Sequence, residues 1–351
     1  MKILLVCNYK PGVGGISGQV EILQRKLRSE GHPADIFSTK ASILRRLLLP
    51  MRLCSVARNY DVLHIHCCSG WGFLPAVIGI GVGRWLKKRI VLTYHGGGGE
   101  KFFDRHHRLV HHYLTRTDVN IVLSGFLASV FKKHDIPYTI IPNIIELDET
   151  QFRQRDSLKP NFICTRAHEE LYNIPCILRA FQKALTELPE ATLTLVGDGS
   201  QHAALTQMVK DMGLQNVTFT GKVDNHEIYR QLNHADIFLS SPTIDNMPVS
   251  VLEAMNAGLL VISSHVGGVP YVVKDHDIDD DHGCDDDNDD GCGTGLLFES
   301  NNDQKLAEKM LWAIKNPDKT TGIIQEAHHE MKKYRWENIK DKLYQAYGIP
   351  A

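Results

Sequence analysis

The chain has 351 residues, enough for about two domains of roughly 150 residues each. Its 43% hydrophobic and 23% charged content excludes a wholly disordered protein, and its formal net charge of -2 argues against a dedicated nucleic-acid-binding protein. The N-terminal residues lack the features of a signal peptide, the longest apolar run (Phe73–Gly83) is too short to span a bilayer, and the irregularly spaced cysteines favour free thiols. We therefore expect a cytoplasmic protein.

Strands alternate with helices along the first half of the sequence. Lys2–Cys7 is a short apolar run typical of a strand, and a glycine-rich turn follows at 11–15. Apolar residues then recur at helical spacing from Ile16 until Gly31, which is typical of a helix end. Further strands are predicted at Val62–His66, Ile90–Tyr94, Val119–Leu123 and Thr139–Ile141.

The same alternation returns after the polar segment 151–160, which we interpret as a linker. Strands are predicted at Asn161–Thr165, Thr192–Val196, Val217–Thr220, Asp236–Ser240 and Leu259–Ser263, and helices at Gln201–Asp211, His226–Leu232 and Val249–Ala257. Such alternation predicts parallel sheets covered by helices on both faces. The predicted fold class is α/β, with two doubly wound Rossmann-like domains (1–150 and 161–334) that face each other across a cleft.

The strongest functional signal is the segment 243–258 and the glycines that follow it. Asp245 is predicted on a loop after a strand, Pro248 in a first helical turn and Glu253 further along the helix. Free backbone N–H groups and the dipole at such a helix start attract an anion. The plainer alternative is that Asp245 or Asn246 only caps the helix while Glu253 lies on a solvated face.

This segment resembles the E-x7-E region of retaining glycosyltransferases of the GT-B fold, family 4. Further motifs of that family occur in the same order at Gly14-Gly15, Thr93–Gly96, Ile141–Asn143, Leu195–Gly199, Val217–Gly221, Ala235–Pro242 and Arg335–Tyr347. The resemblance implies a nucleotide-sugar-dependent hexosyltransferase that retains configuration and requires neither a cofactor nor a metal. It also implies a C-terminal helix in 335–351 that crosses back to the first domain.

The resemblance assigns roles to individual residues. Three are implied to be catalytic: His95 beside the reacting sugar, Asp245 on the hydroxyls of the transferred sugar, and Arg166 on the leaving diphosphate. Glu253 would accept hydrogen bonds from the two ribose hydroxyls, as a carboxylate does well. The other residues assigned to substrate binding are Gly14, Gly15, Lys222, Val223, Asn246, Met247, Pro248 and Val249.

Two positions depart from the family pattern. The first acid is Asp245 rather than Glu, one methylene shorter, and the usual Lys after Arg166 is absent. Tyr172 and Asn173 stand near its place and bring no charge, so Lys222 is a candidate to compensate. The departures motivate the alternative of a catalytically silent nucleotide-sugar-binding or membrane-associated assembly protein.

Parts of the sequence are also compatible with two other enzyme classes. A nicotinamide-dependent oxidoreductase built on Gly12-x-Gly14 is disfavoured, because Ser17 stands where the third glycine of that fingerprint is required. A sugar-nucleotide epimerase of the same fold would form its product from the donor alone, which distinguishes it from a transferase by assay.

Two motifs invite a metal-site interpretation. His107 and His111 have the i, i+4 spacing of some metal sites, but no acidic ligand accompanies them, and a basic helix face is favoured. The tract 275–290 contains ten aspartates, and residues 286–291 match the start of a calcium loop. Leu297 occupies the twelfth position of that loop, where calcium requires Glu, so we interpret the tract as an acidic surface insertion.

Charge is unevenly distributed along the chain. Residues 1–155 carry 22 basic and 11 acidic residues, whereas the remainder carries 17 and 30. The basic residues that lie among leucines and tryptophans in the first half are Arg45, Arg46, Arg52, Arg58, Arg84, Lys87, Lys88 and Arg89. They fit either a solvated face or an anionic membrane surface. The expected partners are a nucleotide-sugar donor, a glycan or lipid-linked acceptor and the inner face of a membrane, contacted peripherally.

Overall fold

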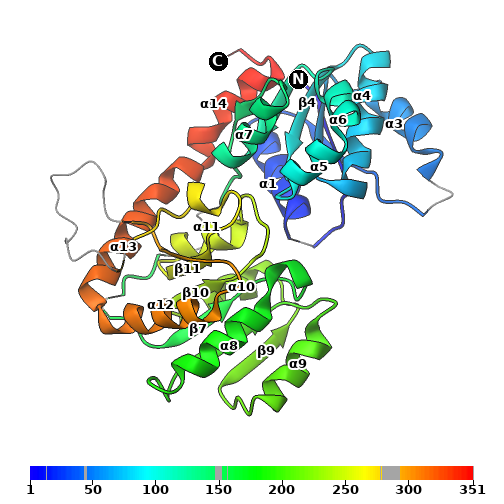
Figure 1. Cartoon of the computed structure of the whole chain (residues 1–351). Helices are drawn as coiled ribbons and strands as arrows, with labels where there is room; N and C mark the ends of the chain where they lie inside the picture. Colours follow the sequence, from blue (N-terminus) through cyan, green and yellow to red (C-terminus); the bar gives the residue numbers. More distant parts are fainter. Residues whose placement is uncertain are drawn as a thin grey trace. The chain divides into compact units, whose positions relative to one another are not determined.

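The computed structural model describes residues 1–12, 14–42, 46–146, 152–155, 157–276, 278 and 293–350 (Figure 1). The chain divides into two compact units, the first formed by Met1–Ile144 with Tyr334–Ala351 and the second by Ile145–Lys333. Each unit contains a six-stranded sheet in which all paired strands are parallel. The predicted α/β class with two doubly wound domains is therefore confirmed.

The sheet of the first unit has the strand order β2-β1-β3-β4-β5-β6. Its strands are β1 (Ile3–Cys7), β2 (Ala34–Ser38), β3 (Val62–Cys67), β4 (Arg89–Tyr94), β5 (Val119–Val122) and β6 (Thr139–Ile140). The helices of this unit are α1 (Ile16–Ser29), α3 (Leu49–Ala57), η1 (Gly70–Phe73), α4 (Leu74–Trp85), α5 (Gly99–Arg105), α6 (His107–Leu114), α7 (Gly125–Lys133) and α14 (Trp336–Tyr347).

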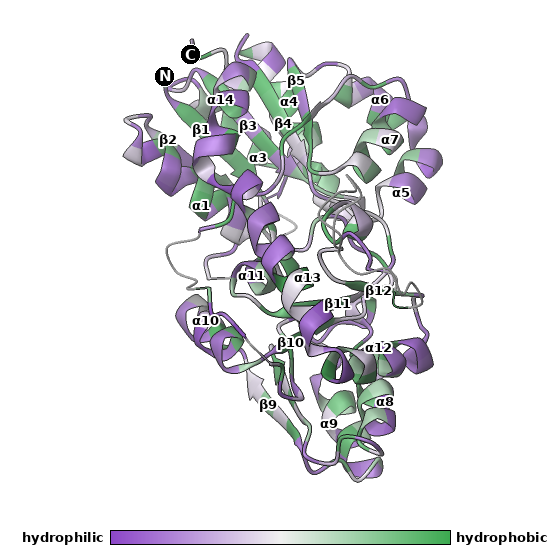
Figure 2. Ribbon diagram, turned by 90° about the vertical axis from the view of Figure 1, so that its left-hand side faces the viewer, coloured by the Kyte–Doolittle hydropathy of each residue, from purple (hydrophilic) through white to green (hydrophobic). Residues whose placement is uncertain are grey.

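Alternate residues of β1 enter two different hydrophobic cores. Leu4 and Val6 pack with residues of α3 to α7 on one face of the sheet, whereas Leu5 packs with α1 and α14 on the other. Figure 2 shows that β1, β3 and β4 are predominantly hydrophobic, as strands buried on both faces must be. Trp336 and Tyr347 of α14 belong to the second core, so the expected helix that returns to the first domain is confirmed.

The sheet of the second unit has the order β12-β11-β10-β7-β8-β9. Its strands are β7 (Asn161–Cys164), β8 (Thr192–Val196), β9 (Val217–Gly221), β10 (Ile237–Ser240), β11 (Leu260–Ser264) and β12 (Leu296–Phe298). Its helices are η3 (Glu170–Tyr172), α8 (Ile174–Ala184), α9 (His202–Asp211), α10 (Asn225–His234), α11 (Val249–Asn256), η4 (Val269–Tyr271), α12 (Asp303–Lys315), α13 (Pro317–Glu330) and η5 (Met331–Tyr334). In α8, the apolar residues Ile174, Ile177, Leu178 and Phe181 share the face that packs into the core of this unit.

Both sheets reverse their strand order at one point. In the first unit the reversal lies between β1 and β3, and in the second it lies between β7 and β10. The connections that leave the carboxyl ends of two such strands pass to opposite faces of the sheet, which opens a crevice where ligands bind in this class of fold. The loops that follow β7 and β10 carry Arg166 and Asp245, respectively.

Arg155, which the sequence placed in the linker, is anchored in the second unit. Its side chain is 1% exposed and donates hydrogen bonds to the Asp236 carboxylate (3.1 Å) and to the carbonyls of Ala235 (2.7 Å) and Ala257 (2.9 Å). The two carbonyls lie at the C-terminal ends of α10 and α11, where no later helical N–H is available. The Arg155 guanidinium therefore caps two helices and, together with Arg153, neutralises a buried carboxylate.

Arg45 lies outside the described residues, as does most of the acidic tract, including the calcium-loop match at 286–291. Among the described helices, none is both long and apolar enough to cross a membrane. The six cysteines in the described part of the chain are all free thiols.

Candidate active site

Arg166 and Asp245 meet at the switch point of the second sheet. The Arg166 side chain is 8% exposed, and its guanidinium pairs with the Asp245 carboxylate and donates a 2.7 Å hydrogen bond to Oγ of Ser250. Nε of Arg166 is buried and has no hydrogen-bond partner among the described residues. Burial lowers the pKa of Arg166, but the charge and hydrogen bond of Asp245, together with smaller effects of Tyr172 and Cys164, more than compensate, and the pKa is raised overall.

Two glycines allow the loops around this ion pair to approach one another. A Cβ at Gly197, where φ is +138°, would lie 2.5 Å from the carbonyl oxygen of Arg166. A Cβ at Gly268 would lie 2.0 Å from the carbonyl oxygen of Asn246, directly after Asp245. Any other residue at these positions would push the loops apart, so both glycines help to fix the Arg166–Asp245 geometry.

Tyr172 occupies the region where the family pattern has a lysine. The guanidinium carbon of Arg166 lies 4.1 Å from the centre of the Tyr172 ring, which is a cation–π contact. Ser241 donates to the carbonyls of Tyr172 (3.0 Å) and Asn173 (2.9 Å), which ties this loop to the end of β10. The loop therefore supplies an aromatic face for the arginine and no second cation.

Helix α11 begins immediately beside the ion pair. The Asn246 backbone N–H donates to Asp245 (2.8 Å), and Pro248 precedes the first helical residue, Val249. Asn246, Met247 and Pro248 are buried, whereas Val249 and Glu253 are half-buried one helical turn apart. The structure thus brings together Arg166, Asp245 and the predicted binding segment 246–249, with Glu253 on the same helix.

The remaining predicted substrate-binding residues lie in loops at the carboxyl ends of other strands. Gly14 and Gly15 are exposed in the loop between β1 and α1, and a Cβ at either would meet no atom within 4 Å. Lys222 and Val223 follow β9, which is separated from β7 by β8, and Lys222 is exposed. The structure does not bring Lys222 into the ion pair with Arg166 and Asp245.

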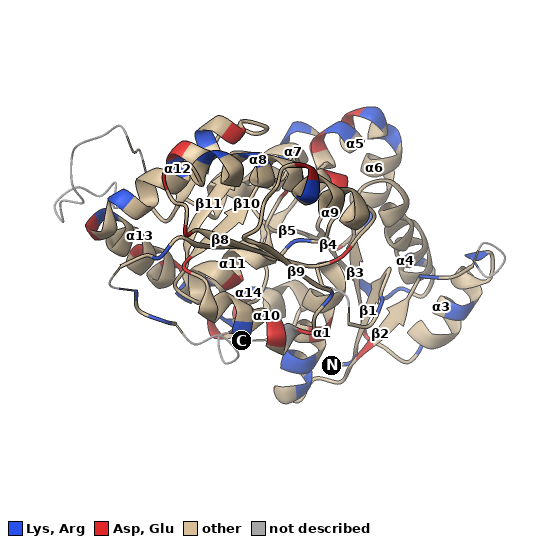
Figure 3. Cartoon of the chain, turned by 90° about the horizontal axis from the view of Figure 1, so that it is seen from below, with Lys and Arg blue, Asp and Glu red and all other residues tan. Residues whose placement is uncertain are grey.

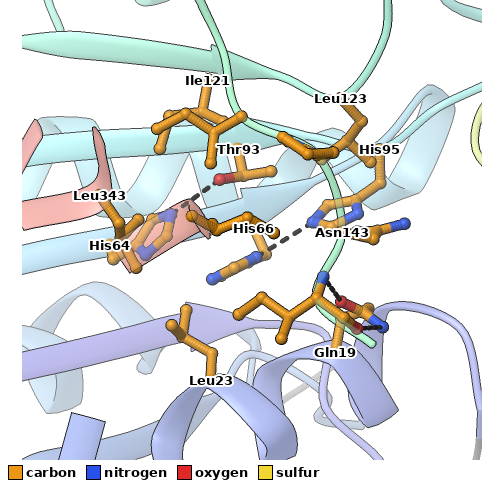
Figure 4. A pocket seen from close by; sticks show the side chains of 14 residues that line it. Gln19, Leu23, His64, His66, Thr93, His95, Ile121, Leu123, Asn143 and Leu343 are labelled. Atoms are coloured by element: carbon orange, nitrogen blue, oxygen red, sulfur yellow. Dashed lines mark hydrogen bonds between the residues drawn. The ribbon is translucent and has the colours of Figure 1, made fainter. Parts of the chain in front are cut away.

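A row of three histidines runs from the middle of β3 to the carboxyl end of β4 (Figure 4). His64 and His66 point the same way from β3, and His95 directly follows β4. Nδ1 of His66 lies 3.0 Å from Nε2 of His95, and the His64 ring nitrogens lie 2.8 Å from the hydroxyls of Tyr347 and Thr93. The histidines line a pocket of about 40 Å³ with Gln19, Leu23, Thr93, Ile121, Leu123, Ile141, Pro142, Asn143, Ile144, Ile339 and Leu343.

Burial keeps these histidines neutral. It lowers the pKa of His64 to about 3 and that of His95 to about 4, and it lowers the pKa of His66 well below its usual value. A neutral imidazole offers one N–H donor and one lone pair, so the row can direct hydrogen bonds to a ligand but carries no charge at pH 7. His64, His66, Tyr347 and Ser250 are the site residues that sequence reasoning missed, although the spacing of the two histidines on a strand already places them on one face.

The motif with metal-site spacing, His107 and His111, does not form a metal site among the residues that the structure describes; His107 instead contacts His134. Nδ1 of His107 lies 3.0 Å from Nδ1 of His134, whose Nε2 lies 3.1 Å from the Asp104 carboxylate. No group of three or more His, Cys, Asp or Glu residues able to hold a metal occurs within the described ranges.

Arg89 does not lie on the exposed basic face that the sequence predicted. It is half-buried on β4 and donates a 2.8 Å hydrogen bond to the carbonyl of Ala346.

Comparison with known families identifies this arrangement. Residues 148–334 match the family described as glycosyl transferases group 1, and residues 31–149 match glycosyltransferase family 4. The chain belongs to the group 1 glycosyl transferases. Arg166, Asp245 and Glu253 of this transferase lie in the first match, and the row of His64, His66 and His95 lies in the second.

Relatives of this group 1 transferase include one enzyme named for a small molecule and one named for a lipid. It is 25% identical over 314 residues to N-acetyl-alpha-D-glucosaminyl L-malate synthase of Bacillus anthracis, with 84% of this chain and 76% of that protein covered. It is 24% identical over 324 residues to alpha-monoglucosyldiacylglycerol synthase of Streptococcus pneumoniae, with 77% and 71% covered.

Solved structures share the fold of this transferase. HepE of Anabaena, in complex with UDP, superposes with a TM-score of 0.75 at 17% identity, over 99% of this chain and 100% of that one. Sucrose-phosphate synthase of Thermosynechococcus elongatus superposes with a TM-score of 0.80 at 17% identity, over 99% and 98%. The GT-B fold of two Rossmann-like domains is thereby established.

Proposed function

We propose that this glycosyltransferase moves a hexosyl group from a nucleotide-sugar donor to a glycan, lipid-linked or small-molecule acceptor, with retention of configuration. The observation that carries the proposal is the buried Arg166 beside Asp245 at the switch point of the second sheet, next to the start of α11. The UDP bound in the HepE structure is consistent with a nucleoside diphosphate as the leaving group.

In this proposal the second unit binds the donor. Glu253 accepts hydrogen bonds from the ribose hydroxyls, and Asp245 contacts hydroxyls of the transferred sugar. Arg166 donates charge-assisted hydrogen bonds to the diphosphate, and each such bond contributes about 1.5–3 kcal/mol. The negative charge that develops on the leaving oxygen is stabilised by Arg166 and by the free N–H groups at the start of α11. The acceptor hydroxyl then attacks the anomeric carbon from the same face of the sugar, while the bond from that carbon to the diphosphate breaks and the hydroxyl proton passes to the departing diphosphate.

The test combines donor binding with turnover. Thermal unfolding with UDP-, GDP- and ADP-sugars identifies the nucleotide, because a ligand that binds only the native state stabilises it. Glu253→Ala is expected to weaken binding of the identified donor by about 2 kcal/mol, which is roughly a thirtyfold higher Kd, measured by calorimetry. Glu326→Ala, on α13 of the same unit, serves as a matched control. Unchanged affinity in a folded Glu253→Ala protein would remove Glu253 from the donor site, and binding without turnover on any acceptor would favour the silent binder.

We also propose that the surface formed by α3, η1 and α4 with the residues that flank them (46–57 and 70–88), here called the α3–α4 surface, contacts an anionic membrane. Its exposed apolar side chains include Leu47 (80% exposed), Met51 (72%), Trp71 (83%) and Trp85 (67%). Basic residues accompany them, and the Arg46 guanidinium lies 5.7 Å from the centre of the Trp71 ring. Figure 3 shows Lys and Arg at α3 and around α5 and α6. Apolar side chains bordered by cations are the features that bind an anionic bilayer surface.

Vesicle sedimentation tests the α3–α4 surface. Replacing Lys87 and Lys88 by Ser is expected to remove about 2 kcal/mol of attraction to anionic vesicles, roughly thirtyfold in partitioning. The matched control replaces Lys40 and Lys132, two exposed lysines of the same unit outside this surface. Equal binding to neutral and anionic vesicles, or no binding at low salt, would show that the basic residues of this surface do not attract an anionic membrane.

A further inference from the structure

His66 is the middle ring of the buried histidine row. Its ring centre lies 4.2 Å from that of His64 and 5.3 Å from that of His95, and its side chain is almost fully buried. One ring nitrogen, Nδ1, is bonded to Nε2 of His95 at 3.0 Å. The other, Nε2, is buried and has no hydrogen-bond partner within the described residues. A buried polar atom that lacks a partner requires an explanation.

The shared hydrogen bond links the protonation of the two rings. Both are neutral, so each carries one N–H, and only one of the two facing nitrogens can hold the bonding proton. If His95 donates from Nε2, the proton of His66 must lie on its own Nε2, and a buried N–H is left without an acceptor. If His66 donates from Nδ1, its Nε2 is unprotonated and carries only an unused lone pair. The proton of His95 then lies on Nδ1 of that ring.

The second arrangement is favoured by the cost of unpaired groups. Orphaned buried N–H groups are rarer in proteins than acceptors with unused lone pairs, because a buried donor loses its hydrogen bond to water outright. Nδ1 of His95 makes no hydrogen bond with the described residues, and His95 itself is half-buried rather than enclosed. In the favoured arrangement, this open nitrogen of His95 carries a hydrogen.

We propose that His66 is a positioning residue that holds His95 in its Nδ1–H tautomer, so that His95 presents a hydrogen-bond donor to an oxygen of the substrate. The part that concerns the substrate rests on the proposed glycosyl transfer, whereas the tautomer is a property of the free protein. A role in packing alone does not require a histidine at this position, since leucine would fill a similar volume without burying two polar nitrogens.

Nitrogen-15 NMR of the full chain with labelled histidines tests the tautomer. Long-range proton–nitrogen correlations distinguish a protonated from an unprotonated ring nitrogen, and His95→Gln identifies the His95 signals. The wild type is expected to show His95 protonated at Nδ1. In His66→Asn the amide N–H replaces Nδ1–H of His66 and preserves this tautomer, whereas His66→Leu releases it. His64→Asn, a matched change at a buried histidine not bonded to His95, is expected to preserve it. His95 protonated at Nε2 in the wild type would overturn the proposal.

Kinetics separate positioning from packing. His66→Leu is expected to lower kcat about 10- to 100-fold with little change in KM, and His66→Asn is expected to recover most of that loss. Equal losses in two folded variants would mean that only packing matters and would overturn the positioning role. Absence of turnover in the wild type on every donor and acceptor would instead contradict the proposed function, while the NMR result would still decide the tautomer.

Discussion

Replacing Asp245 by Asn tests whether the Arg166–Asp245 pair is a prepared anion site. The substitution keeps the size and one acceptor oxygen of the side chain but removes the countercharge of a guanidinium that is 8% exposed. Breaking one side of a buried ion pair costs about 3–5 kcal/mol, because the remaining charge stays in a poorly solvated place. Asp245 is itself 16% exposed, so we expect the lower end of that range.

A loss of about 3 kcal/mol lowers the unfolding temperature of a unit of this size by roughly 6–12 °C. A bound nucleoside diphosphate would return negative charge to Arg166. UDP, GDP or ADP, whichever binds, is therefore expected to raise the unfolding temperature of Asp245→Asn more than that of the wild type. The opposite effect is expected on turnover, because the sugar loses its contact with the carboxylate.

Calorimetric unfolding with and without the diphosphate is the assay. Asp211→Asn, the same charge change at an exposed position of the second unit, is the control and should shift stability by less than about 0.5 kcal/mol. Ser250→Ala, which removes a hydrogen bond without changing charge, should cost about 1 kcal/mol. If the diphosphate stabilises Asp245→Asn no more than it stabilises the wild type, Arg166 does not bind the diphosphate.

Three further outcomes are expected. Lowering the pH from 7 to 5 destabilises the first unit by about 2 kcal/mol for each of His64 and His95. Their pKa values (about 3 and about 4) return to about 6.5 on unfolding, so the unfolded chain binds the extra protons. A urea midpoint that does not move between the two pH values would contradict this. Arg155→Met lowers the free energy of unfolding of the second unit by at least about 2 kcal/mol, and a loss below half of that would count against the double cap. Tyr172→Ala weakens diphosphate binding about fivefold in calorimetry through loss of the cation–π contact with Arg166, whereas Tyr172→Phe retains it; equal effects of both changes would exclude the ring as the cause.

The sequence predicted the fold where its periodicity was strong. The strands predicted at Thr192–Val196 and the helix at Gln201–Asp211 agree with β8 and α9 to within one residue, because strand and helix repeats differ clearly there. The edge strands β2 and β12 were missed, since short strands at a sheet edge have little pattern to distinguish them from loops.

The candidate site was predictable only in part. Arg166 and Asp245 were named because short motifs surround them, but their pairing depends on two loops that are 79 residues apart in sequence. Tyr347 could not be connected to His64 from sequence at all, because 283 residues separate them and only the docking of α14 brings their side chains together. Distant contacts of this kind are set by topology rather than by local pattern.

The position of α14 in the chain has a consequence for how the protein is made. Trp336, Ile339 and Leu343 complete the core of the first unit, yet the ribosome synthesises them only after the whole second unit. At bacterial and eukaryotic elongation rates, the intervening residues take about 10–40 s to make. During that interval the face of β1 and α1 that α14 will cover remains apolar and open. The first unit, although begun earliest, is therefore completed last, and a nascent chain that stalls before residue 336 exposes a surface that chaperones or other nascent chains can bind.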